Sequence, residues 1–127
     1  MTSPPSITLV HQDARGELYS ISLPDNRELM LLHSTKGSLR GGHSHSVSEV
    51  VMLLTGKMRY HKVLNPLVTL TQDLEAGGTS GNAPGEVHMG EFLEDSWLIE
   101  FKLARKGEWT QENYEPLRAR VRASTVG

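Results

Sequence analysis

Apolar residues in this chain come only in short runs, and glycine, proline, asparagine or aspartate separates one run from the next. Runs of about four to eight residues between such turn residues are typical of β-strands. We expect strands in ITLV (7–10), ELYSISL (17–23), ELMLLHS (28–34), EVVMLL (49–54), KMRYHKV (57–63), VTLTQDL (68–74), EVHMGEF (86–92) and SWLIEFKLA (96–104). Short strands at this spacing indicate an all-β barrel or sandwich.

Two connections between these runs carry further information. Thr55-Gly56 separates the runs 49–54 and 57–63, which predicts a tight hairpin. The glycine-rich stretch Gly77–Gly85 predicts a plain loop. A phosphate-binding loop would need a helix after it, whereas a strand is expected there.

The run 96–104 alternates between apolar and polar residues. In a strand, Trp97 and Phe101 share one face with Ile99, and Glu100 and Lys102 occupy the other. We therefore expect Trp97 and Phe101 to be part of the core.

Only the C-terminal segment has a helical pattern. Tyr114, Leu117 and Val121 recur at helical spacing, and Thr110 is a suitable capping residue. Pro116 is unfavourable inside a helix. The segment predicts one short C-terminal helix.

Length, charge and composition limit the class of protein. The 127 residues suit a single domain, residues 1–127, and the net charge of −2 favours neither nucleic acid nor an anionic membrane as partner. The sequence has no apolar run of about 20 residues and no signal-peptide pattern, so we expect a cytoplasmic protein. With no cysteine, a metal site would have to use histidine or carboxylate ligands.

The segment GGHSHSVSEVVMLLTG (41–56) concentrates such ligands. His43 and His45 share one face of a strand, about 6.6 Å apart along it. Glu49 reaches the same ion only if the chain turns within Ser46–Ser48 and a new strand starts at Glu49, running back beside the histidines. His88, after Pro84-Gly85, is a fourth candidate ligand. Three imidazoles and one carboxylate suit one divalent transition ion per chain: Fe, Mn, Ni, Co, Cu or Zn.

This segment resembles the first motif of the cupins, in which glycine, His-x-His, glutamate and a later glycine follow in order. Gly42, His43, His45, Glu49 and Gly56 fit that order, and Gly37 lies at the usual distance before His43. The resemblance implies a jelly-roll β-barrel with the metal inside one mouth.

The second cupin motif is matched less completely. Gly85 lies three residues before His88, as in the family, but Ala83 replaces the expected proline and Phe92 the expected asparagine. The resemblance, which spans about residues 27–103, implies His43, His45, Glu49 and His88 as metal ligands. Many small cupins form homodimers through terminal strands, and we expect a homodimer here.

Three further residues are expected to line the substrate pocket. Met58 and Tyr60 share one face of the strand 57–63. Arg40 lies in RGGHSH, which also resembles a segment of nucleotide-sugar ketoisomerases, cupin-like barrels in which arginine binds phosphate.

We expect a metal-dependent enzyme that acts on a small organic molecule, sugar- or keto-acid-like, as an oxygenase, isomerase or lyase. Glu49 would then be a ligand or the catalytic base. One alternative is a metal-independent nucleotide-sugar isomerase or epimerase with His43 or His45 as acid–base group and Arg40 as phosphate anchor. Another is a non-catalytic barrel that binds a small ligand.

Overall fold

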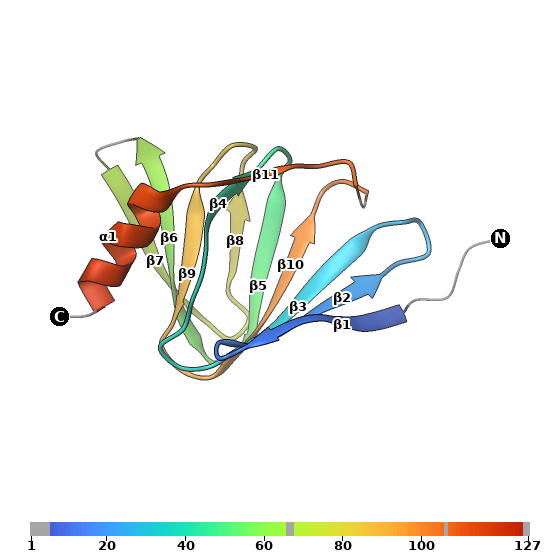
Figure 1. Cartoon of the computed structure of the whole chain (residues 1–127), viewed down its shortest axis with the longest axis horizontal. Coiled ribbons are helices and arrows are strands. Elements are labelled where there is room, and N and C mark those ends of the chain that lie inside the picture. The colour runs from blue at the N-terminus through green and yellow to red at the C-terminus, as the bar shows by residue number, and fades with distance from the viewer. Residues whose placement is uncertain (1–5, 66–67, 106, 126–127) are drawn as a thin grey trace.

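The chain forms two antiparallel sheets and one C-terminal helix (Figure 1). A computed structural model describes residues 6–65, 68–105 and 107–125. From edge to edge, the larger sheet contains β1 (Ser6–Asp13), β2 (Gly16–Ser22), β3 (Glu28–Ser34), β10 (Ser96–Lys102), β5 (Glu49–Thr55) and β8 (Thr79–Asn82). The smaller sheet contains β11 (Gln111–Asn113), β4 (Leu39–His45), β9 (His88–Phe92), β6 (Lys57–Asn65) and β7 (Val68–Glu75).

The two sheets enclose one apolar core, to which both contribute. The buried core residues are Leu32, Val51, Leu53, Met58, Tyr60, Leu74, Phe92 and Leu98. Two packed antiparallel sheets with a short helix at the end confirm the predicted all-β jelly roll. All eight apolar runs of the sequence are strands, because their β-branched and aromatic residues fit a pleated surface with one face buried.

The predicted hairpin at Thr55-Gly56 is wrong. β5 and β6 belong to different sheets, so Gly56 is the corner at which the chain passes from the larger sheet to the smaller one. A short glycine turn suits such a corner as well as it suits a hairpin, because both need a positive φ, here 92°. For the same reason β5, which begins at Glu49, runs in the sheet opposite β4 and not beside it.

The expected plain loop at Gly77–Gly85 is wrong in its middle. Thr79–Asn82 form β8, which pairs with β5 at the edge of the larger sheet. Backbone pairing makes this strand despite its glycine and its small polar side chains, which give no hydrophobic signal.

The predicted placement of Trp97 and Phe101 in the core is also wrong. Trp97 is 36% exposed, whereas its neighbour Leu98 is 3% exposed and belongs to the core. Alternation therefore places Glu100 and Lys102 on the inner face of the sheet. Alternation distinguishes the two faces of a strand, but it does not say which of them is inside.

The C-terminal helix α1 (Glu115–Thr125) lies against β4 and β9 of the smaller sheet. Leu117 and Val121 are buried against Met89, as the helical spacing predicts. Pro116 is in the first turn, where a missing backbone N–H costs no hydrogen bond, so it starts this helix and does not disrupt it. Thr110 precedes β11 and does not cap the helix. In the described ranges, no helix has the length and apolar character to cross a membrane.

Candidate metal centre

A β-bulge in β4 aims the side chains of this strand into the barrel. The pairing of β4 with β9 shifts between Gly41 and His43, and both Gly41 and Gly42 have positive φ values, 99° and 79°. Residues three apart in a regular strand point to opposite faces. The extra residue of the bulge therefore lets Arg40 and His43 face the same interior.

Three histidines converge at the mouth of the barrel. His43 and His45 lie on β4, and His88 begins the neighbouring β9, where it pairs with His43. One ring nitrogen from each histidine lies within 4.8 Å of the other two. His45 and His88 are 4% and 5% exposed, so water reaches them poorly. The ordinary ligand spacing of a transition ion fits such a group.

Hydrogen bonds fix which nitrogen of two rings is protonated. Nδ1 of His88 lies 3.1 Å from the carbonyl oxygen of Glu86, which only accepts, so Nδ1 donates and the neutral ring has a lone pair on Nε2. Nε2 of His45 lies 3.2 Å from Oε1 of Gln111, so the lone pair of His45 is on Nδ1. Both lone pairs point to Glu49: Nε2 of His88 is 3.3 Å from Oε1 and Nδ1 of His45 is 3.7 Å from Oε2.

Glu49 is 1% exposed and lies beside the histidines at the start of β5. Oε1 accepts a hydrogen bond of 3.1 Å from Nδ2 of Asn82, which also donates to the hydroxyl of Tyr60 at 2.6 Å. Oε2 is 3.2 Å from Nζ of Lys102. Asn82 and Lys102 thus hold the carboxylate in place and partly compensate its burial.

The electrostatics keep His43 and His45 neutral and Glu49 ionised. Burial, reinforced by His88 and His45, lowers the pKa of His43 to about 3, and burial lowers the pKa of His45 to about 4. Burial by itself raises the pKa of Glu49, but the contact with His88 and the charge of Lys102 outweigh it and bring the pKa to about 2. Neutral imidazoles and an ionised carboxylate are the forms that bind metal.

The donor set fits a divalent cation. Among the described residues, Nδ1 of His45 is buried without a hydrogen-bond partner, and Oε2 of Glu49 accepts no hydrogen bond beyond its ion pair with Lys102. Imidazole lone pairs facing carboxylate oxygens repel each other unless a cation lies between them. Hydrogen bonds from the far side of His45 and His88 also orient the rings as is usual for metal-ligating histidines.

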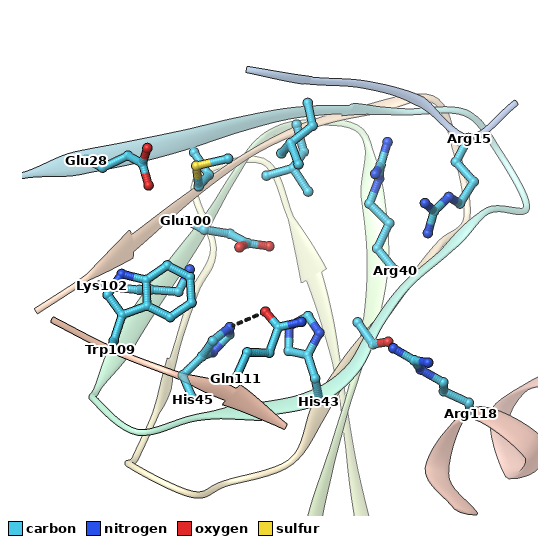
Figure 2. Close-up of a pocket in the computed structure, with 14 residues that line it drawn as sticks. Arg15, Glu28, Arg40, His43, His45, Glu100, Lys102, Trp109, Gln111 and Arg118 are labelled. Carbon is cyan, nitrogen blue, oxygen red and sulfur yellow. Dashed lines mark hydrogen bonds between the residues drawn. The ribbon is translucent and has the colours of Figure 1, made fainter. Parts of the chain in front are cut away.

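A cavity of about 390 Å³ opens in front of this group (Figure 2). Figure 2 shows His43, His45 and Gln111 at one side of it, Lys102, Trp109 and Glu100 at another, and Arg40 and Arg15 opposite. Burial and the charge of Glu49 raise the pKa of Glu100 to about 7. No sequence motif indicates Lys102, Glu100, Trp109 or Gln111 as residues of the site. For Lys102 and Glu100, the direction of the side chain also depends on which face of β10 is inside.

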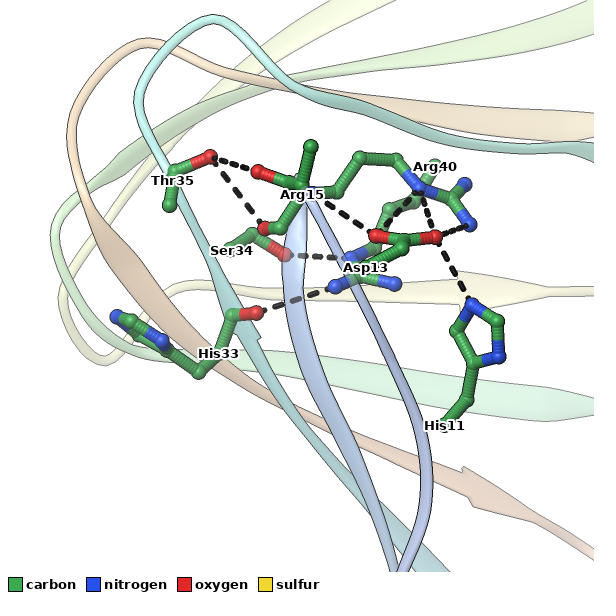
Figure 3. Close-up of polar contacts among 8 residues, drawn as sticks. His11, Asp13, Arg15, His33, Ser34, Thr35 and Arg40 are labelled. Atoms are coloured by element: carbon green, nitrogen blue, oxygen red, sulfur yellow. Dashed lines mark hydrogen bonds and ion pairs between the residues drawn. The ribbon is translucent and has the colours of Figure 1, made fainter.

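Arg40 lines this cavity from the strand that carries the histidines, and Figure 3 shows its contacts with Ser34 and His33. Its Nε donates to Oγ of Ser34 at 2.6 Å and its Nη2 to the carbonyl oxygen of His33 at 3.1 Å. Within the described part of the chain Arg40 has no carboxylate partner, whereas the neighbouring Arg15 is paired with Asp13. Burial and the charge of Arg15 lower the pKa of Arg40.

Met58 and Tyr60 lie deeper, in the core beneath the histidines. They line a small cavity of about 20 Å³ together with His43 and His88. The Tyr60 ring stacks on the His88 ring, with 5.9 Å between the two ring centres. Both side chains are buried, with 0% and 3% exposure. They support the floor of the site and do not line the larger cavity.

Comparisons with known proteins show which solved structures have a similar architecture. No protein-family model matches the sequence, and no curated protein does. Among solved structures, the capsular polysaccharide assembling protein CapF from Staphylococcus aureus is similar with a TM-score of 0.70 and 18% identity, over 87% of this chain and 34% of that one. Vicilin from Corylus avellana (hazelnut) has a TM-score of 0.71 and 15% identity, over 83% and 34% of the two chains.

A variant of oxalate decarboxylase from B. subtilis is similar with a TM-score of 0.60 and 18% identity, over 75% of this chain and 28% of that one. The chain thus spans about a third of the length of these cupin-fold proteins. At this level of identity the likeness shows the fold alone. Together with the three converging histidines, it shows that the chain has the cupin fold and supports a metal-binding cupin.

Proposed function

We propose that this protein is a metal-dependent enzyme that acts on a small organic molecule in the cavity before His43, His45 and His88. The observation that carries the proposal is the convergence of imidazole lone pairs on Glu49, in a buried site that opens into the cavity. The three histidines and Glu49 would hold one divalent transition ion. Fe, Mn, Ni, Co, Cu and Zn all accept this donor set.

The metal would supply a Lewis acid to a substrate oxygen, or a centre that activates O₂ if it is iron. The residues of the chain supply the rest. Glu49 is a ligand or, if released, a base, and Lys102 keeps it ionised in either case. Glu100 faces the same cavity with a pKa of about 7, which suits a group that gives and takes a proton near neutral pH.

The lining of the cavity favours a substrate with acidic or hydroxyl oxygens. Arg40, without a carboxylate partner among the described residues, offers free N–H groups to such oxygens. A sugar- or keto-acid-like molecule matches this lining. Oxygenase, isomerase and lyase reactions all use such a site, and function depends on the site and not on the barrel. Met58 and Tyr60 would act as the floor of the pocket.

One observation favours the metal-independent isomerase as a second candidate. Arg40 and His43 line the same cavity, as a phosphate anchor and an acid–base group would. However, a histidine with a pKa of about 3 is a weak base at neutral pH. A non-catalytic barrel would use the same cavity to bind a ligand without turnover.

Elemental analysis of untagged protein tests the metal. We expect about one transition ion per chain in the wild type and a loss of most of it in His88→Ala. His61→Ala is a matched control, because His61 is also a buried histidine, 7% exposed, but pairs with Glu91 outside the histidine group. It should retain its metal.

Two results would contradict the proposal. A folded wild-type protein that binds no ion from a metal-supplemented medium would favour the isomerase without metal. Full metal content in His88→Ala would show that His88 is not a ligand.

A further inference from the structure

The inner face of the larger sheet changes from apolar to charged along the cavity. Directly opposed residues on neighbouring strands point to the same side of a sheet, so the strand register aligns the inward side chains in rows. In order along the strands, three such pairs are Leu18 with Leu32, Met30 with Glu100, and Lys102 with Glu49. Successive rows lie about 6.8 Å apart. The last row is the one beside the histidines.

The side of the cavity formed by β2 and β3 is an apolar wall, made by Leu18, Met30 and Leu32. All three line the cavity, and all three belong to the core cluster or pack against it. Their side chains offer no N–H group, O–H group or oxygen to a ligand. A methylene group buried against the wall gains about fourfold in affinity. A hydroxyl group that loses its water there without a new hydrogen bond costs about tenfold.

Cationic groups lie at both ends of the apolar wall (Figure 2). Arg40 is at one end, where it donates to Oγ of Ser34, which lies one row beyond Leu32 on β3. Among the described residues, Nη1 of Arg40 has no hydrogen-bond partner, so it is available to an anion. Lys102 and the histidines are at the other end. A ligand that contacts both ends must therefore pass along the apolar wall.

We propose that the substrate is an elongated keto acid with an unsubstituted carbon chain between its two polar ends. Its carboxylate binds Arg40, its chain lies against the apolar wall, and its carbonyl oxygen faces the histidines. This inference rests on the function proposed above and narrows it. A sugar would place hydroxyl groups against the wall, and a short keto acid with adjacent carboxylate and carbonyl groups would not reach both ends.

Calorimetric titration with two matched dicarboxylates tests this substrate class. Adipate and 3,4-dihydroxyadipate have the same chain length and the same two carboxylates, one of which replaces the reacting oxygen. They differ only in two hydroxyl groups on the middle carbons. Because the charges of the cavity act on both alike, the ratio of their dissociation constants isolates the effect of the wall. Adipate should bind the Zn²⁺-loaded protein at least about tenfold more tightly.

A shorter diacid tests the distance between the two ends. Succinate lacks two methylene groups of adipate, so it should bind about 15-fold more weakly. Succinate that binds as tightly as adipate would show that the ligand does not extend along the wall, and it would overturn the proposal.

Met30→Gln tests whether the wall causes the preference. Glutamine has nearly the size of methionine, and its amide can bond to a hydroxyl group, so the preference for adipate should fall at least about fourfold. Met52→Gln is the matched control, because Met52 is 37% exposed on β5 and does not line the cavity. It should retain the wild-type preference. Equal affinity of the wild type for the two six-carbon diacids, or an unchanged preference in Met30→Gln, would overturn the proposal.

The same titrations of metal-free protein separate this test from that of the metal. The second carboxylate then meets Lys102, and the preference for adipate should persist because the apolar wall needs no ion. A preference for adipate in a protein that binds no metal would contradict the proposed metal dependence and support the substrate class. Metal binding without such a preference would do the reverse.

Discussion

At the scale of single residues, Lys102 brings a positive charge into the candidate metal centre. Its ammonium group is buried, 3.2 Å from Oε2 of Glu49 and 4.2 Å above the ring of Trp109. A metal ion bound at the histidines and the ammonium group of Lys102 would both lie beside the Glu49 carboxylate, and the two positive charges would repel each other. Lys102 therefore stabilises the metal-free site and opposes the binding of a divalent ion.

Replacing Lys102 by methionine should separate these two effects. In Lys102→Met, Glu49 is left buried without its cation, so the metal-free protein should lose about 3 kcal/mol of unfolding free energy. Zn²⁺ should bind about tenfold more tightly and restore the melting temperature, because the repulsion is gone. Competition with a chromophoric chelator and melting with and without Zn²⁺ measure both quantities.

Lys57→Met is the control for this experiment, because Lys57 pairs with Glu94 at the surface, 53% exposed. It should change neither quantity. Weaker or unchanged Zn²⁺ binding in Lys102→Met would show that Lys102 positions Glu49 and does not compete with the ion.

The sequence predicted the residues of the site that lie in motifs. His43, His45 and Glu49 are close in the chain, and His88 follows a recognisable turn, so their convergence could be expected. Lys102 lies in a strand in which apolar and polar residues alternate. This alternation does not determine which face of the strand is turned to the inside of the barrel. The outcome depends on the opposite sheet, which no local pattern describes.

Among the structural elements, the corner at Gly56 links the two sheets. A Cβ on Gly56 would lie 2.1 Å from Oγ of Ser96 and 2.6 Å from the carbonyl oxygen of Asp95, and φ is 92°. Gly77 has almost the same φ, 89°, but nothing within 4 Å of its would-be Cβ. The two positions thus share the backbone strain and differ in the contact.

Alanine at each position should separate strain from contact. Gly77→Ala should cost about 1 kcal/mol of unfolding free energy, because only the left-handed conformation opposes it. Gly56→Ala should cost at least about 2 kcal/mol more, because the corner must also shift away from Ser96 and Asp95. Urea denaturation of both variants measures the difference. Equal losses would mean that the corner yields freely and does not fix the spacing of the sheets.

Strand positions were easier to predict than strand partners. The apolar runs located β5 and β6, but the same short turn serves a hairpin within one sheet and a corner between two. β8 was missed because its pairing with β5, and not its own side chains, makes it a strand. Pairing is a long-range property, and periodicity within one segment does not encode it.

For the whole molecule, the buried ionisable groups predict how stability depends on pH. His43 and His45 have pKa values of about 3 and 4, below the usual 6.5, so the unfolded chain holds up to two more protons and stability falls as pH drops below 6.5. Glu100 has a pKa of about 7, above the usual 4.5. Between pH 4.5 and about 7, Glu100 is protonated in the folded state but not in the unfolded state, so this group alone makes the protein more stable as pH drops.

Between pH 4.5 and 6.5 these effects oppose each other. The two histidines add about two protons to the unfolded state, and Glu100 adds about one to the folded state. The unfolded state therefore holds about one proton more, so the unfolding free energy changes by about 1.4 kcal/mol per pH unit. Glu100→Gln removes the opposing group, so the slope of unfolding free energy against pH should roughly double. Urea denaturation of metal-free protein at several pH values measures the slope.

Glu94→Gln is the control for this slope, because Glu94 is an exposed carboxylate that pairs with Lys57. It should retain the wild-type slope. An unchanged slope in Glu100→Gln would mean that Glu100 is ionised in the folded protein throughout this range. A second negative charge would then face the cavity at neutral pH, and a neutral or cationic substrate would fit it better than the acidic molecule proposed above.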